Sequence, residues 1–319
     1  MGPEPSLADV YLARRRIAPY LRPTPLIRPA ALGRDLEADV ALKLENLQPI
    51  GAFKVRGGIN LVAAEGAALA GRRLLAASTG NHGQSIAYAA RQFGLRAAIY
   101  APADANALKV ASMRALGAEV VLTGRDFDAA REACEAEAAA TGDRYVHSME
   151  EPLLIAGVGT AYLEAIEEVP DADLLIVPIG GGSGASGAGL VAKSINPAMR
   201  VVGVQAEGAP AVYRSFRSGR IESTDRIDTR AEGLATRQAF ALPVGMIRRY
   251  VDDIVLVSDA EMEDAMRLLM ETAHVVAEMA GAAPLAAARK LGVKGQRVIL
   301  PVSGGNATRE QLAGVWRSA

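Results

Sequence analysis

A lysine flanked by glycines is the first feature of this sequence that could do chemistry. Lys54 stands in the segment Gly51-Ala52-Phe53-Lys54-Val55-Arg56-Gly57-Gly58. A free lysine has a pKa of about 10.4, so its neutral form at pH 7 costs about 4–5 kcal/mol. Condensation with an aldehyde removes this obstacle, because the resting group is then an imine. By residue type alone a surface lysine is the commoner interpretation, and the surrounding segment is what favours a reactive one.

A glycine-rich turn is the second such feature. Five glycines gather around one serine, at Gly180, Gly181, Gly182, Ser183, Gly184 and Gly187. Such a turn at the start of a helix offers backbone N–H groups and the positive end of the helix dipole to a phosphate. A tight turn without a ligand is the alternative, but this many glycines after a buried strand favour phosphate. The spacing lacks the Gly-x-Gly-x-x-Gly pattern with a later acidic residue, which disfavours a dinucleotide.

The elements that must position these residues alternate along the chain. Short apolar or β-branched runs predict strands at Leu74–Ala77, Ala97–Tyr100, Val120–Leu122, Leu174–Val177, Val201–Val204, Ile254–Val257 and Val298–Val302. Longer Ala-rich patterns predict helices at Phe53–Ala64, Ser85–Phe93, Ala105–Leu116, Phe127–Ala140 and Met262–Met279. Strands separated by helices indicate an α/β protein with mostly parallel sheets covered on both faces.

Three of the predicted strands lead directly into polar or glycine-rich loops. These loops are Ser78–Gly83, Gly180–Gly184 and Ser303–Asn306. Ligands of such folds bind where strands end and helices begin. The three junctions therefore predict one composite site, with Lys54 at the start of its own helix.

The composition narrows the classes of function. The chain has 319 residues, a formal net charge of −1 and one cysteine, Cys134. A charge near zero gives no electrostatic footprint for nucleic acid, and no apolar run is long enough to span a membrane. A single cysteine cannot form an internal disulfide, which fits a reducing, cytoplasmic setting. No cluster of cysteines and histidines has the spacing of a metal site.

Four motifs, in this order, resemble the threonine/serine dehydratase and serine racemase family of fold-type II pyridoxal-phosphate enzymes. They are Lys43–Gly58, Ser78–Gln84, Gly180–Gly184 and Ser303–Asn306. The opening segments Arg16–Pro19 and Thr24–Leu26 are similar as well. The resemblance runs from about Ser6 to the end of the chain.

The resemblance implies a fold like that of the tryptophan synthase β subunit. Two open, twisted, mostly parallel sheets flanked by helices would hold the cofactor, pyridoxal 5'-phosphate, between two lobes. It implies a large discontinuous cofactor-binding domain, residues 1–70 with 150–319, and a small mobile domain, residues 71–149. A homodimer is also implied.

The resemblance further assigns roles to the motif residues. Lys54 would be the Schiff-base lysine and the base that takes the α-proton. The cofactor would be bound by Phe53, Asn81, Gly180, Gly181, Gly182, Ser183, Gly184 and Ser303. The substrate carboxylate would be bound by Ser78, Thr79, Gly80, Asn81 and His82. Hydroxyls and loop N–H groups suit a carboxylate, and Ser303 would face the pyridine nitrogen.

The implied reaction is dehydration of a β-hydroxy amino acid, such as L-threonine or L-serine, to a 2-keto acid and ammonia. An amino-acid racemase and a dehydratase for a larger 3-hydroxy amino acid are alternatives within the family. Thr79 stands where serine racemases place a second base, and we favour carboxylate binding as its role. A ligand-binding protein without activity would need a defect at Lys54 or the glycine loop, and neither is present. A nucleotide-dependent enzyme also fits this fold class alone.

The sequence departs from the family where many relatives bind a divalent cation. The corresponding positions are Gln205, Ala209 and Ala211, which carry no carboxylate. Hard cations prefer carboxylate oxygens, so we expect no metal there. The residues that contact the β-substituent are expected in the loops Glu232–Ala235 and Glu278–Gly281.

Overall fold

The computed structural model describes residues 3–317 as two compact units. The first unit combines Pro23–Phe53 with residues 159–317, and the second combines residues 3–22 with Lys54–Val158. Each unit is therefore built from two separate stretches of chain, and one boundary falls at the peptide bond between Phe53 and Lys54.

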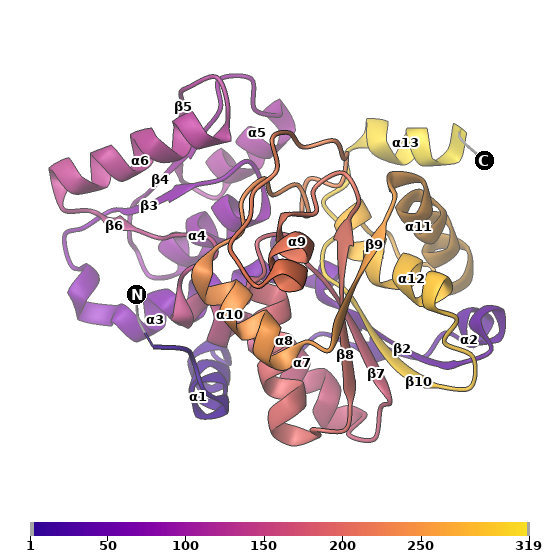
Figure 1. Ribbon diagram of the computed structural model, residues 1–319. Coiled ribbons are helices and arrows are strands. Elements are labelled where there is room, and N and C mark those ends of the chain that lie inside the picture. Colours follow the sequence, from indigo (N-terminus) through magenta and orange to yellow (C-terminus); the bar gives the residue numbers. More distant parts are fainter. Residues whose placement is uncertain (1–2, 318–319) are drawn as a thin grey trace. The chain divides into compact units, whose positions relative to one another are not determined.

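The first unit is built on a six-stranded sheet with the order β1-β2-β10-β7-β8-β9 (Figure 1). Its strands are β1 (Leu26–Ile27), β2 (Asp39–Leu44), β7 (Leu174–Pro178), β8 (Arg200–Ala206), β9 (Asp253–Val257) and β10 (Arg297–Val302). Its helices are α2 (Ala30–Leu36), η1 (Glu45–Leu47), α8 (Ser183–Ile195), α9 (Ala211–Ser218), α10 (Ala241–Tyr250), α11 (Asp259–Ala273), α12 (Met279–Leu291) and α13 (Arg309–Arg317). The helix α7 (Pro152–Glu168) crosses the boundary between the units.

All neighbouring strands of this sheet are parallel except β1, which is antiparallel to β2. The strand β10 lies between β2 and β7, with Val302 opposite Leu44 and Val298 opposite Leu174. Val298, Leu300 and the strands beside them are buried, as expected for a sheet covered on both faces. Because β2, β7 and β10 are parallel, their carboxyl ends lie at the same edge of the sheet.

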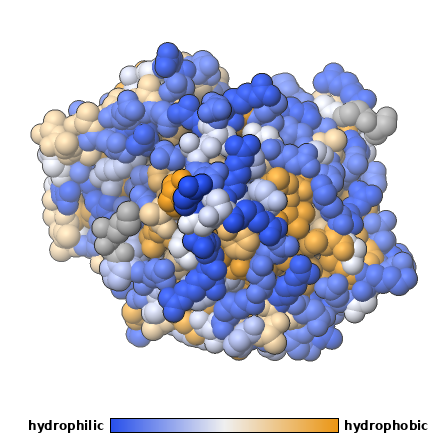
Figure 2. Space-filling view, viewed as in Figure 1, coloured by the Kyte–Doolittle hydropathy of each residue, from blue (hydrophilic) through white to orange (hydrophobic). Residues whose placement is uncertain are grey.

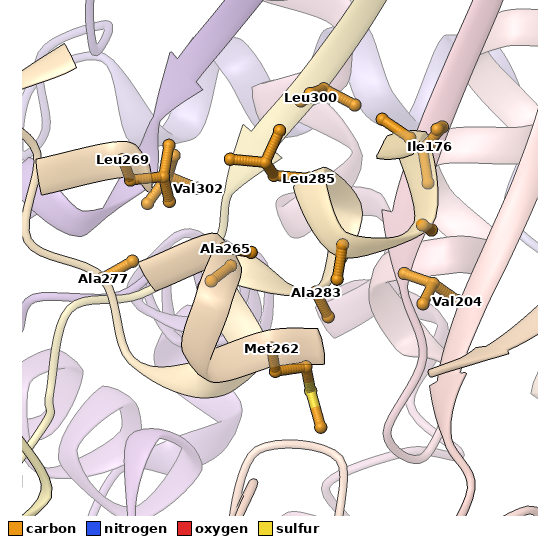
Figure 3. Packing of buried hydrophobic residues seen from close by; sticks show 14 of the residues in the cluster. Ile176, Val204, Met262, Ala265, Leu269, Ala277, Ala283, Leu285, Leu300 and Val302 are labelled. Atoms are coloured by element: carbon orange, nitrogen blue, oxygen red, sulfur yellow. The ribbon is translucent and has the colours of Figure 1, made fainter. Parts of the chain in front are cut away.

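A hydrophobic cluster of buried residues lies between this sheet and the helices α11 and α12 (Figure 3). Ile176, Val204 and Leu300 contribute from the sheet. Met262 and Leu285 contribute from the two helices, which pack against each other. Burial of a large apolar side chain stabilises a fold by about 1.5–3 kcal/mol, so this cluster fixes the strands whose ends form the site.

The second unit is built on a four-stranded parallel sheet with the order β5-β4-β3-β6. Its strands are β3 (Leu74–Ala77), β4 (Ala97–Ala101), β5 (Glu119–Leu122) and β6 (Arg144–Tyr145). Its helices are α1 (Leu7–Ile17), α3 (Lys54–Glu65), η2 (Gly66–Leu69), α4 (Asn81–Gln92), α5 (Ala107–Ala115) and α6 (Phe127–Thr141).

Close packing of α3 on α4 explains why the units differ from the predicted domains. A Cβ on Gly58 would lie 2.5 Å from Ser85 Oγ, so only a glycine allows the two helices to approach this closely. The helix α1 packs on α3 in turn. Residues 3–22, 54–70 and 150–158 therefore group with the smaller unit, whereas the predicted bounds placed them in the larger one. Residues 1, 2, 318 and 319 of those bounds lie outside the described part, and the mobility of 71–149 stays a prediction.

The prediction of an α/β protein with mostly parallel sheets is confirmed. The predicted helix Met262–Met279 is confirmed as far as Ala273, but its C-terminal end is wrong, because α11 ends there and His274 adopts a left-handed conformation with φ 55°. The strands β1, β2 and β6 were not predicted. Two of these are only two residues long, and β2 contains the polar Lys43.

The visible face of the molecule mixes polar and apolar side chains. Figure 2 shows hydrophilic residues over much of this face, with apolar residues exposed in several places between them. Among the helices of residues 3–317, none is both long and apolar enough to cross a membrane.

Candidate active site

The glycine-rich turn joins β7 to α8 in the first unit. Gly182 has φ 103° and forms the N-cap of α8, a backbone conformation that favours glycine. A Cβ on Gly180 would overlap the carbonyl oxygen of Gly233. The chain therefore folds tightly here, and α8 starts with its N–H groups directed at the turn. The first N–H groups of any α-helix have no acceptor inside the helix.

Phe53 lies against this turn. A Cβ on Gly184 would lie 3.2 and 3.3 Å from two carbon atoms of the Phe53 ring and 3.3 Å from the Tyr162 hydroxyl. The ring is partly exposed. Gly184 thus leaves room for an aromatic face beside the start of α8.

The end of β10 is bonded to the segment that precedes Lys54. The Phe53 N–H donates to the Ser303 carbonyl oxygen at 3.0 Å, and the Gly305 N–H donates to the Gly51 carbonyl oxygen at 2.9 Å. Between them, Ala52 and Gly304 form an isolated antiparallel bridge. The buried Ser303 hydroxyl donates to the Ala280 carbonyl oxygen at 3.5 Å. This two-stranded connection fixes Ser303 relative to Phe53.

Glu278 lies next to the same turn, at the N-cap of α12. Its N–H donates to the Gly304 carbonyl oxygen at 3.0 Å, and a Cβ on Gly304 would overlap its Oε1 atom. A Cβ on Gly233 would lie 3.9 Å from Oε1. The two loops expected to contact the β-substituent, Glu232–Ala235 and Glu278–Gly281, are thus neighbours, and a nearly buried carboxylate stands beside the residue after Ser303.

In the second unit, Lys54 is the first residue of α3. The side chain is partly buried, and burial lowers the pKa of Lys54 from its usual value to about 8. The Lys54 carbonyl oxygen accepts from the Ser85 hydroxyl at 2.6 Å. This bond ties the lysine-bearing turn of α3 to α4. The neutral amine is therefore far more accessible near pH 7 than for a lysine in water.

The loop Ser78–His82 joins β3 to α4. The Ser78 hydroxyl oxygen accepts from the N–H groups of Gly80 at 3.1 Å and Gly83 at 2.9 Å. Ser78 is buried and shapes the loop, whereas Thr79, Gly80 and Asn81 are partly exposed. The accessible part of the loop therefore lies at the N-terminal end of α4, where an anion is favoured.

His82 is buried and neutral. Its Nε2 atom lies 3.1 Å from the Val146 carbonyl oxygen and must carry the proton of that bond, so Nδ1 is an acceptor. Burial, with a smaller contribution from the charge of Lys54, lowers the pKa of His82 to about 3. The side chain cannot supply a positive charge at neutral pH.

The positions Gln205, Ala209 and Ala211 are fully buried. The Gln205 Oε1 atom accepts from the Tyr213 N–H at 2.8 Å and so caps the first turn of α9. Within residues 3–317, no group of three or more His, Cys, Asp or Glu side chains could hold a metal ion.

Comparison with known proteins decides the family. The family model described as pyridoxal-phosphate dependent enzyme matches residues 17–304. This chain belongs to that family.

Pyridoxal-phosphate dependent relatives match along nearly the whole chain. The L-threonine ammonia-lyase of Thermotoga maritima is 40% identical over 302 residues, which cover 94% of this chain and 75% of that protein. The L-threo-3-hydroxyaspartate ammonia-lyase of Saccharomyces cerevisiae is 36% identical, and the match covers 97% of this chain and 95% of that protein. The predicted family is therefore confirmed.

Solved structures of such enzymes agree. A threonine deaminase from T.th. has a TM-score of 0.90 at 37% identity, covering 95% of this chain and 99% of that one. Maize serine racemase has a TM-score of 0.92 at 31% identity, and the match covers 99% of this chain and 97% of that one.

The residues present fit pyridoxal phosphate. The turn Gly180–Ser183 offers a helix N-terminus, and Phe53 offers an aromatic face beside it. The tight path of the turn needs glycine, because a Cβ on Gly180 would overlap the Gly233 carbonyl oxygen and one on Gly182 would lie 2.8 Å from Pro243 Cβ. Lys54 follows Phe53 in the chain, and burial favours its uncharged, reactive form. These groups match the phosphate, the ring and the aldehyde of the cofactor.

The predicted site residues divide between the two units. Phe53, Gly180–Gly184 and Ser303 lie in the first, and Lys54 and Ser78–His82 lie in the second. Sequence reasoning gave no role to Lys109. It predicted a role for the loop Glu278–Gly281, but not the contact of the Glu278 carboxylate with Gly304. Lys109 lies in an Ala-rich helical pattern, where a lysine usually marks a solvated face, so the sequence carries no signal for it.

Proposed function

We propose that this pyridoxal-phosphate dependent enzyme is a lyase of the threonine/serine ammonia-lyase type. It converts a β-hydroxy amino acid, such as L-threonine or L-serine, to a 2-keto acid and ammonia. The observation that carries the proposal is Lys54, partly buried at the first position of α3 with its pKa lowered to about 8. The names of the relatives, including the L-threonine ammonia-lyase of Thermotoga maritima, support the reaction class.

Lys54 would hold the cofactor through Nζ and would serve as the general base. When bound, pyridoxal phosphate supplies an aldehyde and an electron-withdrawing ring that ease removal of the α-proton. A general base works best with a pKa near the operating pH. The lowered pKa of Lys54 meets this requirement.

The remaining site residues hold the reactants in place. Gly180, Gly181, Gly182, Ser183 and Gly184 bind the phosphate through N–H groups and the Ser183 hydroxyl. Phe53 would lie beside the ring, Asn81 would contact the 3-hydroxyl, and Ser303 would face the pyridine nitrogen. A serine would leave that nitrogen uncharged, so the ring would be a weaker electron acceptor. Elimination tolerates this, because the negative charge leaves with the β-hydroxyl and does not stay on the ring.

The substrate carboxylate binds at Ser78, Thr79, Gly80, Asn81 and His82. Support comes from the N-terminal end of α4 and from the partial exposure of Thr79, Gly80 and Asn81 in this loop. We further propose a homodimer in the cytoplasm, on the family resemblance and on the free, buried Cys134.

Replacement of Lys54 tests the proposal. The holoenzyme is incubated with a panel of β-hydroxy amino acids, L-serine, L-threonine and 3-hydroxyaspartate among them, and scored for keto acid and ammonia. We expect Lys54→Ala to abolish both products and the visible absorbance of the bound cofactor. Lys294→Ala, which removes an exposed lysine paired with Glu37, is the matched control. Normal turnover by Lys54→Ala would refute the assignment.

Amino-acid racemisation is the second candidate, favoured by the likeness to maize serine racemase. It needs a base on the opposite face of the substrate, and Thr79, partly exposed in the carboxylate loop, carries a hydroxyl that could serve. Chiral analysis of serine after incubation separates the two reactions. Selective loss of racemisation in Thr79→Ala, with rescue by Thr79→Ser, would support this role.

A further inference from the structure

Lys109 lies against the loop that is proposed to bind the substrate carboxylate. A Cβ built on Gly80 would lie 3.9 Å from both Cδ and Nζ of Lys109, and no other neighbouring atom of the described residues comes within 4 Å. Only 8% of the Lys109 residue is exposed. The charged end of an almost buried lysine therefore stands beside Gly80.

The packing of α5 on α4 puts the lysine there. Lys109 and Met113 are four residues apart on α5 and so share one face of the helix. A Cβ on Gly83 would lie 2.6 Å from the Met113 sulfur atom, so α5 contacts the first turn of α4 closely at this point. Met113 fixes the helix against Gly83, and Lys109 reaches Gly80 at the N-cap of α4.

The local charges favour an anion. Gly80 is the N-cap of α4, and the N-terminal end of a helix carries a partial positive charge. Lys109 adds a full positive charge next to it. Hydrogen bonds from an ammonium group to a carboxylate are about twice as strong as those between neutral groups, so two positive groups in this place suit a bound carboxylate.

The loop itself cannot supply a full positive charge. Its residues are Ser78, Thr79, Gly80, Asn81 and His82. The histidine donates from Nε2 to the Val146 carbonyl oxygen and stays neutral, because burial lowers its pKa to about 3. A carboxylate held by these residues alone would keep an uncompensated charge, and burying such a charge is costly.

We propose that Lys109 is a substrate-binding residue whose ammonium group partners the carboxylate held by the loop Ser78–His82. This inference rests on the proposed function and adds the cation that its carboxylate site lacks. The contribution is to binding and not to chemistry, because Lys109 acts on a group that keeps its charge throughout the reaction.

Two small ligands test the proposal on the holoenzyme by isothermal titration calorimetry. One is 3-hydroxypropanoate, which has the carboxylate and hydroxyl of serine but no amino group, and the other is 2-aminoethanol, which has no carboxylate. We expect Lys109→Met to weaken binding of 3-hydroxypropanoate about 10- to 100-fold, the range for one charge-assisted hydrogen bond. Binding of 2-aminoethanol should not change.

Variants on the same helix separate charge from structure. Lys109→Arg keeps the charge and should retain most of the affinity, whereas Lys109→Gln provides a second neutral side chain if the methionine variant does not fold. Arg114→Met removes an exposed cation of α5 and should bind both ligands as the wild type does. In turnover, the KM of the substrate should rise in Lys109→Met with little change in kcat, since uniform binding is lost.

The outcomes are distinct. Equal affinity of Lys109→Met and wild type for 3-hydroxypropanoate would overturn the proposal, and so would an equal loss of affinity for both ligands. Failure of the wild type to release keto acid from any substrate would instead refute the proposed function, and the calorimetric comparison would still be readable.

Discussion

The Phe53 N–H donates a hydrogen bond to the Ser303 carbonyl oxygen at 3.0 Å. The residue that precedes Lys54 is thereby held at the end of β10, about 250 positions later in the chain. Three glycines take part in the contacts beside this bond. The Gly305 N–H donates to the Gly51 carbonyl oxygen, and Gly304 forms the bridge with Ala52. The geometry of the lysine-bearing segment thus depends on residues that carry no side chain.

Gly304 tests this dependence. A Cβ at this position would overlap Glu278 Oε1, so we expect Gly304→Ala to lower the free energy of unfolding by about 1–3 kcal/mol, as overpacking does. Urea denaturation of the purified variants measures the change. Gly314→Ala is the control. Apart from its chain neighbours and the backbone of its own helix, no atom of the described residues lies within 4 Å of the added methyl group, and alanine favours the helix α13. A Gly304→Ala protein as stable as the wild type would show that Glu278 yields without cost.

Gly182 links backbone conformation to cofactor binding. Its φ of 103° is strained for alanine, and an added Cβ would lie 2.8 Å from Pro243 Cβ. We expect Gly182→Ala to shift the start of α8 and to weaken pyridoxal-phosphate binding about tenfold or more. A tenfold change in the dissociation constant corresponds to a loss of about 1.4 kcal/mol of binding free energy. Dialysis followed by cofactor absorbance gives the dissociation constant. Gly292→Ala, also at positive φ but with open space around it, controls for strain alone and should bind the cofactor normally.

His82 gives the chain a defined response to acid. Burial lowers its pKa from about 6.5 to about 3, so between these values the folded protein binds fewer protons than the unfolded chain. The stability contribution is complete above pH 6.5 and is lost as the pH falls toward 3. We expect His82→Asn to reduce the slope of unfolding free energy against pH in this window by up to about 1.4 kcal/mol per unit.

The same histidine should show no titration in NMR spectra between pH 5 and 8, with His82→Asn identifying its ring signals. A midpoint inside that range would contradict the bond from Nε2 to the Val146 carbonyl oxygen. It would also reopen the question of which cation faces the carboxylate loop.

Chelation should leave the enzyme unaffected. Gln205 Oε1 already accepts from the Tyr213 N–H, and Ala209 and Ala211 offer no carboxylate. We expect EDTA, magnesium and calcium to change neither the melting temperature nor the rate of keto-acid formation. The double variant Gln205→Glu with Ala211→Asp supplies the missing oxygens, and a calcium-dependent rise in its melting temperature is the positive control. Loss of wild-type activity in EDTA would refute the expectation.

Much of the fold is legible from local patterns. The runs Leu74–Ala77 and Val298–Val302 are buried parallel strands, and such strands are continuously apolar, so the sequence predicts them to within a residue. The strand β2 was missed because Lys43 interrupts it. That lysine is buried and donates to Glu164 at 2.6 Å, a partner 121 positions away that no local pattern reveals.

The site was predicted as far as its motifs extend. The residue types of the glycine-rich turn and of Lys54 already indicate phosphate binding and a reactive amine. The structure places the turn at the start of α8 and Lys54 at the start of α3. Lys109 could not be found in this way, and for Glu278 the sequence indicated only its loop and not the contact of its carboxylate. Their roles arise from what they contact, Gly80 and Gly304, and these contacts join elements that are separate in sequence.

The place of β10 in the sheet has a consequence for how the protein is made. This strand lies between β2 and β7 yet is the last of the six to leave the ribosome. Until it emerges, β2 and β7 have no strand to join them, and the apolar faces they will bury remain open. Ser303, which follows β10, arrives at the same moment as the strand that completes the sheet. We therefore expect the nascent chain to retain cofactor only after β10 has joined the sheet.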